Sequence, residues 1–233
     1  MKRIPWLLVC AVALFLVACG SDGNESSTGN ESDGLPGEAP PVATATPTAT
    51  AQAPVADLSD RLGEMTLDED DVPRDYVEMA SMSFEYDTKL LGVAGVPRGK
   101  AQMAMFSGPG QSETIASMVI LLDDASAVEQ ALSQIDNLTT DQVQDAFGMA
   151  GDFGGMKLVD LRQLDVSGLG ETAFGFALTM ELPQVGVGNG QWVFFGRDSL
   201  LAMVMTMAMG DTIPVDAVLL AEVMDDKIDG VLH

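Results

Sequence analysis

Four methionines alternate near the C-terminal end of the chain, at Met203, Met205, Met207 and Met209. Side chains two residues apart lie on the same face of a β-strand, so these four thioethers should share one face. An earlier segment repeats the spacing with Met103 and Met105. Flexible, polarizable thioethers suit three kinds of site: an adaptable packed core, a deformable apolar ligand pocket and a Cu(I) centre.

A copper centre fits the sequence least well of the three. No histidine or cysteine accompanies the methionines, and extended strands would hold the thioethers apart. We therefore predict no metal site and no cofactor, and both the packed core and the apolar pocket stay open. The candidate ligand-binding residues are Met203, Met205, Met207, Met209, Met103 and Met105.

Residues for catalysis are scarce. The single histidine is the last residue, His233, which argues against Ser-His-Asp or Cys-His catalysis and against the usual histidine-containing zinc sites. Adjacent carboxylates such as Asp123 and Asp124 could perform acid–base chemistry on glycans. A chain with 35 acidic residues contains such pairs without any function, however. We predict that the protein is not an enzyme and assign no catalytic residue; a carboxylate-dependent glycan hydrolase is the remote alternative.

Acidic residues also restrict the partners. The formal net charge is −24, whereas binding to nucleic acid depends on Lys and Arg that neutralise phosphates. This charge excludes a nucleic-acid partner and disfavours anionic lipid headgroups. The acidic run from Asp68 to Asp71 lacks the alternating ligands and central glycine of an EF-hand loop, so we interpret it as a solvated loop.

The N-terminus has the pattern of an export signal. Lys2 and Arg3 precede an apolar run from Trp6 to Ala18, which is too short to span a bilayer stably. The run ends in Leu16-Val17-Ala18-Cys19. This ending resembles the lipobox of bacterial lipoproteins.

The resemblance implies that residues 1–18 are a signal peptide and that cleavage leaves Cys19 as a lipidated N-terminus. Acyl chains such as palmitate would then anchor the protein to the cell membrane on its extracytoplasmic face, or to an outer membrane where the cell has one. Cys10 would leave with the signal peptide. No cysteine would remain for a disulfide in the rest of the chain.

Residues 19–56 have the composition of a tether. A stretch rich in Ser, Asn and Gly is followed by a stretch of Pro, Ala and Thr, and neither can bury enough apolar surface to fold. We expect one domain over residues 57–233.

Hydrophobic periodicity predicts the elements of this domain. Helices are expected at 57–65, 125–135 and 140–147, and a last helix is expected from Pro214, a favoured first-turn residue, to Gly230. Asn189-Gly190 is typical of a two-residue hairpin turn. The expected strands are 78–86, 100–106, 114–122, 156–164, 172–182, 191–195 and 199–209.

The two halves of the domain resemble each other. Each carries a hairpin followed by a helix, and Ser-Met-Val around Met118 matches Ala-Met-Val around Met203. We predict an α+β domain in which an antiparallel sheet is packed by helices on one face, with two related ββα halves.

Two functions fit these expectations best. The first is a membrane-tethered, non-catalytic domain that binds or senses a ligand outside the cytoplasm, with an apolar molecule as the favoured ligand. The alternative is an envelope scaffold that contacts another protein and has a filled core.

The anchor predicts the behaviour of a Cys19→Ala variant. Without the thiol, the protein should leave the membrane fraction or accumulate as uncleaved precursor, because no thioether to lipid can form. Detergent-phase partitioning of the mature protein measures this, and unchanged partitioning of Cys19→Ala would refute the anchor.

Overall fold

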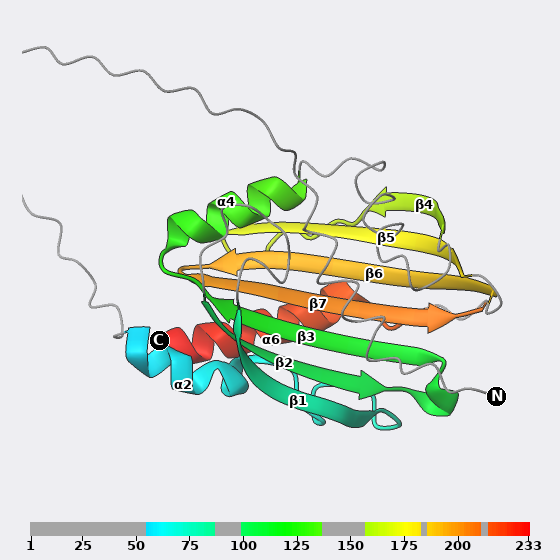
Figure 1. Ribbon diagram of the computed structural model, residues 1–233, viewed down its shortest axis with the longest axis horizontal. Helices are drawn as coiled ribbons and strands as arrows, with labels where there is room; N and C mark the ends of the chain where they lie inside the picture. The colour runs from blue at the N-terminus through cyan, green and yellow to red at the C-terminus, as the bar shows by residue number, and fades with distance from the viewer. Residues whose placement is uncertain (1–54, 87–98, 137–156, 183–185, 211–213) are drawn as a thin grey trace, which may run out of the picture.

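The computed structural model describes residues 55–86, 99–136, 157–182, 186–210 and 214–233. Within them, seven antiparallel strands form one sheet in the order β1-β2-β3-β7-β6-β5-β4 (Figure 1). The strands are β1 Val77–Tyr86, β2 Gly99–Ser107, β3 Glu113–Leu121, β4 Lys157–Gln163, β5 Thr172–Leu182, β6 Gly186–Arg197 and β7 Leu200–Met209.

The described residues also form three α-helices: α2 Val55–Met65, α4 Ala125–Asp136 and α6 Ala217–Leu232. A short 3₁₀ turn, Pro109–Gln111, joins β2 to β3. The predicted α+β class is confirmed, and most predicted elements agree with the structure to within two residues. The helix expected at 140–147 lies outside the described residues. No helix in the described part of the chain has the length and apolar character that a membrane crossing requires.

The central strands are buried on both faces. In β7, Met203 and Met205 belong to one apolar cluster, whereas Ala202 and Val204 belong to a second cluster across the sheet. We call the first side the methionine face, defined by Met103, Met105, Met118, Met203, Met205 and Met207, all of which are buried.

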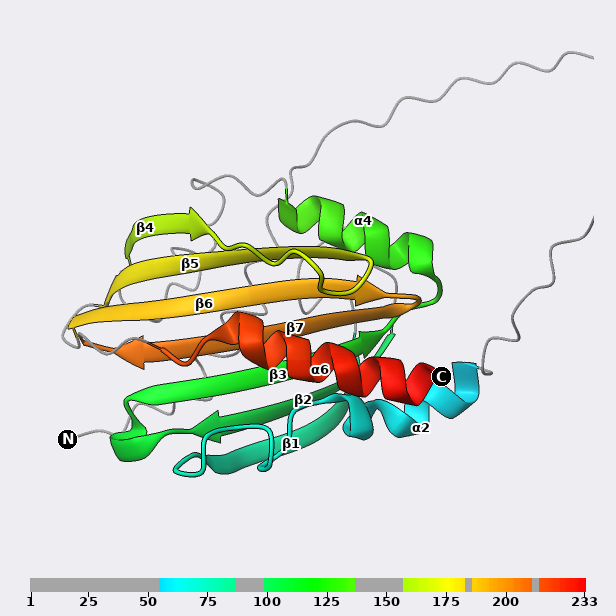
Figure 2. The same ribbon diagram turned by 180° about the vertical axis from the view of Figure 1, so that it is seen from behind.

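The helices lie on both faces of this sheet, which corrects the prediction that they share one. α2 and α6 pack opposite the methionine face, and α6 uses the predicted stripe of Ala217, Leu220, Ala221, Met224 and Ile228. α4 packs on the methionine face through Ala127, Val128, Ala131, Leu132 and Ile135. Figure 1 shows α4 beside β5 and β6, and Figure 2 shows α6 and α2 crossing the reverse side.

The position of α4 depends on a glycine in β6. A Cβ atom at Gly196 would lie 2.5 Å from Cγ1 of Val128 and 2.9 Å from Cδ1 of Leu132, closer than side chains pack. Because Gly196 has no side chain, α4 can lie directly on the strand. Helical periodicity shows that α4 is amphipathic but does not show which face of a sheet will accept it.

The expected turn at Asn189-Gly190 is wrong, because both residues lie inside β6. The Oδ1 of Asn189 accepts a hydrogen bond from Thr179 at 3.1 Å, and its Nδ2 donates to the carbonyl of Gly210 at 3.1 Å. These cross-strand bonds hold Asn189 within the sheet. The last β5–β6 pair is Leu182 with Gly186, whose φ of 109° suits the end of a turn.

The start of the last helix also differs from the prediction. α6 begins at Ala217, not at Pro214, because Asp216 supplies the N-cap: its side chain accepts from the amide of Val218 at 2.9 Å. Gln191 in β6 accepts from the amide of Ala217 at 2.9 Å. Both bonds satisfy amides that a helix start leaves without partners.

The similarity between the two halves extends only to their hairpins. Met118 and Met203, the residues matched in sequence, lie directly opposite each other in the β3–β7 pair. A two-fold axis normal to the sheet at this point would relate the β2–β3 hairpin to the β7–β6 hairpin. The same axis would place α4, which follows the first hairpin, and α6, which follows the second, on the same face of the sheet. They lie on opposite faces, so the symmetry does not include the helices.

Candidate functional site

The methionines of neighbouring strands form a row across the sheet. Strand register places Met103 opposite Met118, Met118 opposite Met203, and Met203 opposite Phe194. The row continues to Phe174 in β5. Side chains directly opposite each other on one face of an antiparallel sheet are in contact, so the row forms a continuous apolar surface.

A second row runs parallel to the first. Met105 lies opposite Ala116, which lies opposite Met205, and Met205 lies opposite Trp192. Trp192 is followed by Phe176 in β5. The ring centroid of Phe176 lies 6.2 Å from that of Trp192 and 5.8 Å from that of Phe194, within the range of favourable aromatic pairs. The methionine face therefore becomes aromatic towards β5.

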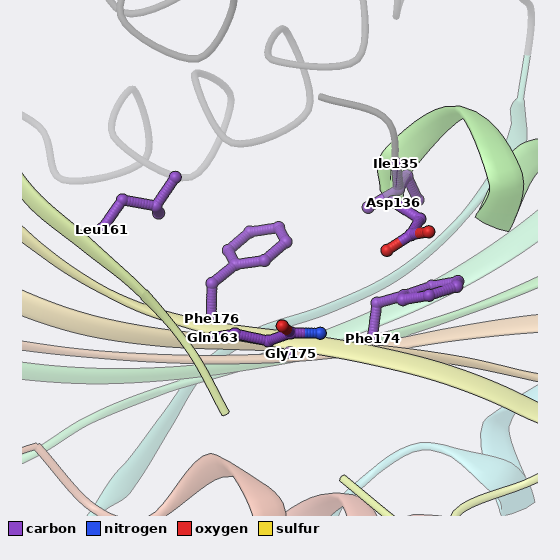
Figure 3. A pocket seen from close by; sticks show the side chains of 7 residues that line it. All are labelled: Ile135, Asp136, Leu161, Gln163, Phe174, Gly175 and Phe176. Carbon is purple, nitrogen blue, oxygen red and sulfur yellow. The ribbon is translucent and has the colours of Figure 1, made fainter. Parts of the chain in front are cut away.

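A cavity of about 190 Å³ lies at this aromatic end. Phe174, Gly175 and Phe176 contribute from β5, and the other residues come from β4 and the last turn of α4: Leu161, Gln163, Ile135 and Asp136. Figure 3 shows Phe176 between Leu161 and the end of α4, with the Asp136 carboxylate turned towards the phenylalanines. Asp136 and Gln163 are exposed, whereas Phe174 and Phe176 are half-buried. Asp136 therefore lies at the mouth, and Gln163 lies beside Phe176 at the sheet edge.

The predicted methionines lie on the same face of the sheet as this cavity but do not line it, because β6 separates those of β7 from β5. Met103, Met105, Met203, Met205 and Met207 are at most 8% exposed and belong to one cluster. Met209 is half-buried and lies outside that cluster. Their assignment as ligand-binding residues stays a prediction, whereas the structure shows that five of the six pack together.

The alternating methionines did not predict the residues that line the cavity, which are mostly aromatic and aliphatic. Phe174 and Phe176 alternate in β5 in the same way as Met203 and Met205 alternate in β7. Two neighbouring strands with aromatic residues at period two would have indicated an aromatic patch. The contribution of α4 could not have been found in this way, because it depends on the contact at Gly196.

An ionic group on the opposite side of the sheet fixes α6 to the sheet. Arg197, at the end of β6, donates to both oxygens of Asp225 at 2.7 and 2.8 Å and to Asp229 at 3.1 Å. The amide of Gly170 donates to the same Asp225 carboxylate at 3.0 Å. The hydrogen bonds to Asp225 raise the pKa of Arg197 above its ordinary value. Asp225 is buried and fully engaged, so this group serves structure.

The acidic run at residues 68–71 has a cationic partner that the sequence did not reveal. Nζ of Lys227 in α6 lies 2.7 Å from a carboxylate oxygen of Asp68 and 2.6 Å from one of Asp71. The hydrogen bond from Lys227 is the main reason why the pKa of Asp68 is lowered. Burial lowers the pKa of Lys227, but the two carboxylates outweigh this effect and raise it. The run therefore closes a loop against α6.

Tyr76 and Glu113 form another polar contact between the loop before β1 and the start of β3. The Tyr76 hydroxyl donates to Oε2 of Glu113. Burial, followed by this bond to an acidic partner, raises the pKa of Tyr76 above its ordinary value. This contact, like the ion pairs of α6, joins elements of the fold.

The described residues contain no group of three His, Cys, Asp or Glu side chains that could hold a metal ion. Of the described residues that line the cavity at β5, one carries a carboxylate, Asp136. Glycoside hydrolysis by the usual mechanism requires two carboxyl groups that flank the substrate.

Comparison with known proteins identifies no family. No family model matches the chain, and no curated protein is significantly similar to it. Among solved structures, the extracellular domain of PknH from Mycobacterium tuberculosis has a TM-score of 0.49 at 12% identity, over 75% of this chain and 95% of that one. A putative uncharacterized protein from Mycobacterium smegmatis, the Rv0999 ortholog, has a TM-score of 0.46 at 9% identity, over 78% and 98% of the two chains. At these TM-scores neither likeness carries an argument about function.

The contact between Arg197 and Asp225 predicts a large loss of stability. Replacing Arg197 with Met should lower the free energy of unfolding by about 3 kcal/mol, because Asp225 then stays buried without its cation. Urea unfolding measures this change. The double variant Arg197→Met/Asp225→Leu should recover much of the loss, and a double variant as unstable as the single one would contradict this account.

The contact between Lys227 and Asp68 predicts a small effect that depends on pH. Lys227→Met should cost about 1 to 2 kcal/mol at pH 7, because the pair with exposed Asp68 is screened by solvent whereas Asp71, the second partner, is largely buried. A carboxyl group whose pKa is lowered on folding stabilises the fold above its unfolded-state pKa, and this contribution is lost as the pH falls through its folded-state pKa.

The difference in unfolding free energy between the wild type and Lys227→Met should therefore shrink below the ordinary Asp pKa of 3.8. Urea unfolding at pH 7 and pH 3 provides the comparison. A matched control is Arg162→Met, whose partner Asp160 is also exposed and whose pair lies at the β4 edge. If the difference in unfolding free energy between the wild type and Lys227→Met grows on acidification, Lys227 does not stabilise the fold through Asp68.

Proposed function

We propose that this protein is a lipid-anchored, non-catalytic binding protein of the cell envelope that takes a small apolar or aromatic group into the cavity between α4 and β5. The observation that carries the proposal is the cavity itself, with Phe174, Phe176, Leu161 and Ile135 as its apolar lining. Apolar cavities with a few polar groups at one side are the usual form of small-molecule sites.

The size of the cavity restricts the bound group. An enclosed apolar cavity of about 150 Å³ binds benzene in an engineered protein. This cavity, of about 190 Å³ and open on one side, has room for one ring or a short branched alkyl group. A whole acyl chain does not fit within this volume. The neighbouring side chains of β6, Trp192 and Phe194, are apolar, and the methionines beyond them on the same face can adjust in shape.

The anchor is the second part of the proposal. The lipobox ending at Cys19 supports a location on the extracytoplasmic face of the membrane, and residues 20–54 would separate the domain from the bilayer. In this position the domain would meet ligands outside the cytoplasm.

The alternative function is an envelope scaffold that contacts another protein. The exposed side chains of β1 favour this alternative. β1 lies at the edge of the described sheet, and three of its apolar side chains are exposed: Val77 at 64%, Met79 at 44% and Met82 at 39%. An edge strand with exposed apolar side chains can pair with a strand of another protein.

Titration with toluene tests the cavity. The mature chain from Gly20 to His233, made without lipid so that the probe has no bilayer to enter, has Trp192 as its only tryptophan. Because Trp192 lies beside Phe176, toluene should change its emission in a saturable way. Phe174→Ala should weaken binding about tenfold through loss of ring contact.

The matched control is Leu219→Ala, which removes an exposed apolar side chain from α6 on the opposite side of the sheet. Its affinity for toluene should equal that of the wild type. If emission does not saturate, or if Phe174→Ala binds as well as the wild type, the cavity is not the binding site and the scaffold becomes the better account. Native mass spectrometry of the protein from its own host gives an independent test, because a bound small molecule appears as a discrete added mass.

A further inference from the structure

The chemistry at the mouth of the cavity selects among apolar ligands. Among the described residues, its lining contains one charged side chain, the carboxylate of Asp136, and no Lys or Arg. We propose that the ligand is an organic ammonium ion, whose apolar body lies against Phe174 and Phe176 and whose cationic group lies at Asp136. This inference rests on the proposed function and adds the charge of the ligand to it.

The two phenylalanines favour a cation for a reason separate from the carboxylate. The face of an aromatic ring carries negative potential, and ammonium groups bind within about 6 Å of ring centroids. Figure 3 shows the Asp136 carboxylate and the rings of Phe174 and Phe176 around one open space. A ligand in this space would therefore have negative potential on two sides.

The end of α4 adds to this potential. Asp136 is the last residue of the helix, where the backbone carbonyl groups give the helix its negative end, and the last turn contains no basic residue. Helices usually place cations at this end, because a carboxylate there is repelled. At Asp136 the carboxylate and the carbonyl groups instead act together on the cavity mouth, which favours a bound cation.

The nearest basic residue on β4 does not cancel this charge. Arg162 stands between Leu161 and Gln163, the two β4 residues that line the cavity, so its side chain leaves the opposite side of the strand. Its guanidinium lies 3.0 Å from Asp160. The charge of the whole chain, −24, also attracts cationic ligands and repels anionic ones.

Two probes of similar size and opposite charge test the inference in the mature chain. Benzyltrimethylammonium should bind at least about tenfold more tightly than phenylacetate, as measured by Trp192 emission. Asp136→Asn should lower the affinity for benzyltrimethylammonium about tenfold and change the affinity for toluene by no more than about twofold. The variant should fold normally, because it removes a charge that the helix end repels.

The matched control is Glu129→Gln, which makes the same change of charge on the exposed side of α4, away from the cavity. Its affinity for benzyltrimethylammonium should stay within about twofold of the wild type. A second variant, Asp136→Lys, should reverse the preference towards phenylacetate.

The outcomes separate the inference from the function on which it rests. The ammonium inference is wrong if toluene binds but the affinity for benzyltrimethylammonium is no higher than that for phenylacetate. It is also wrong if Asp136→Asn and Glu129→Gln change the affinity for benzyltrimethylammonium equally. In both cases the apolar site stands. If neither toluene nor benzyltrimethylammonium binds, the proposed function fails and the inference fails with it.

Discussion

The structure depends on one constraint: its central strands are apolar on both faces and must be covered on both. β7 is buried from Leu200 to Ala208, and β3 is buried from Thr114 to Leu121. An antiparallel sheet usually leaves one face in water, and strands of this kind cannot do so. The chain therefore places α2 and α6 on one apolar surface of the sheet and α4 on the other.

The two surfaces differ in chemistry and in the way they are held. On the α6 side, aliphatic packing is supplemented by Arg197 with Asp225 and by Lys227 with Asp68 and Asp71, so the helix is fixed in place. On the α4 side, the contacts are methionine, aromatic and aliphatic groups, which adjust in shape more easily. The cavity lies on this adjustable side, where α4 reaches the β5 edge with Asp136 as its last residue.

Local periodicity predicted the strands, the three described helices and the shared face of Met203 and Met205, because these features depend on neighbouring residues alone. Features that depend on distant residues were not predicted. The face chosen by α4 depends on Gly196 beneath Val128, and the partner of Asp68 is Lys227, 159 residues away. The misplaced turn at Asn189 has the same origin, because bonds to Thr179 and Gly210 override a local preference. The cavity combines α4, β4 and β5, so no single segment of sequence contains its pattern.

The pairing of α2 with α6 has a mechanical consequence. α2 is the first element of the described chain, and the last residues of α6 lie beside it (Figure 2). There Arg61 donates a hydrogen bond to the carbonyl of Val231 at 3.1 Å. A pull on the segment before Val55 therefore loads α2 first, through the buried Leu58 and Leu62 and the bond from Lys100 to Ser59. Such tension would peel one helix from its neighbours while the hydrogen bonds between strands carry little load. Under tension α2 would detach before the sheet unfolds. The cavity on the opposite face would then keep its shape.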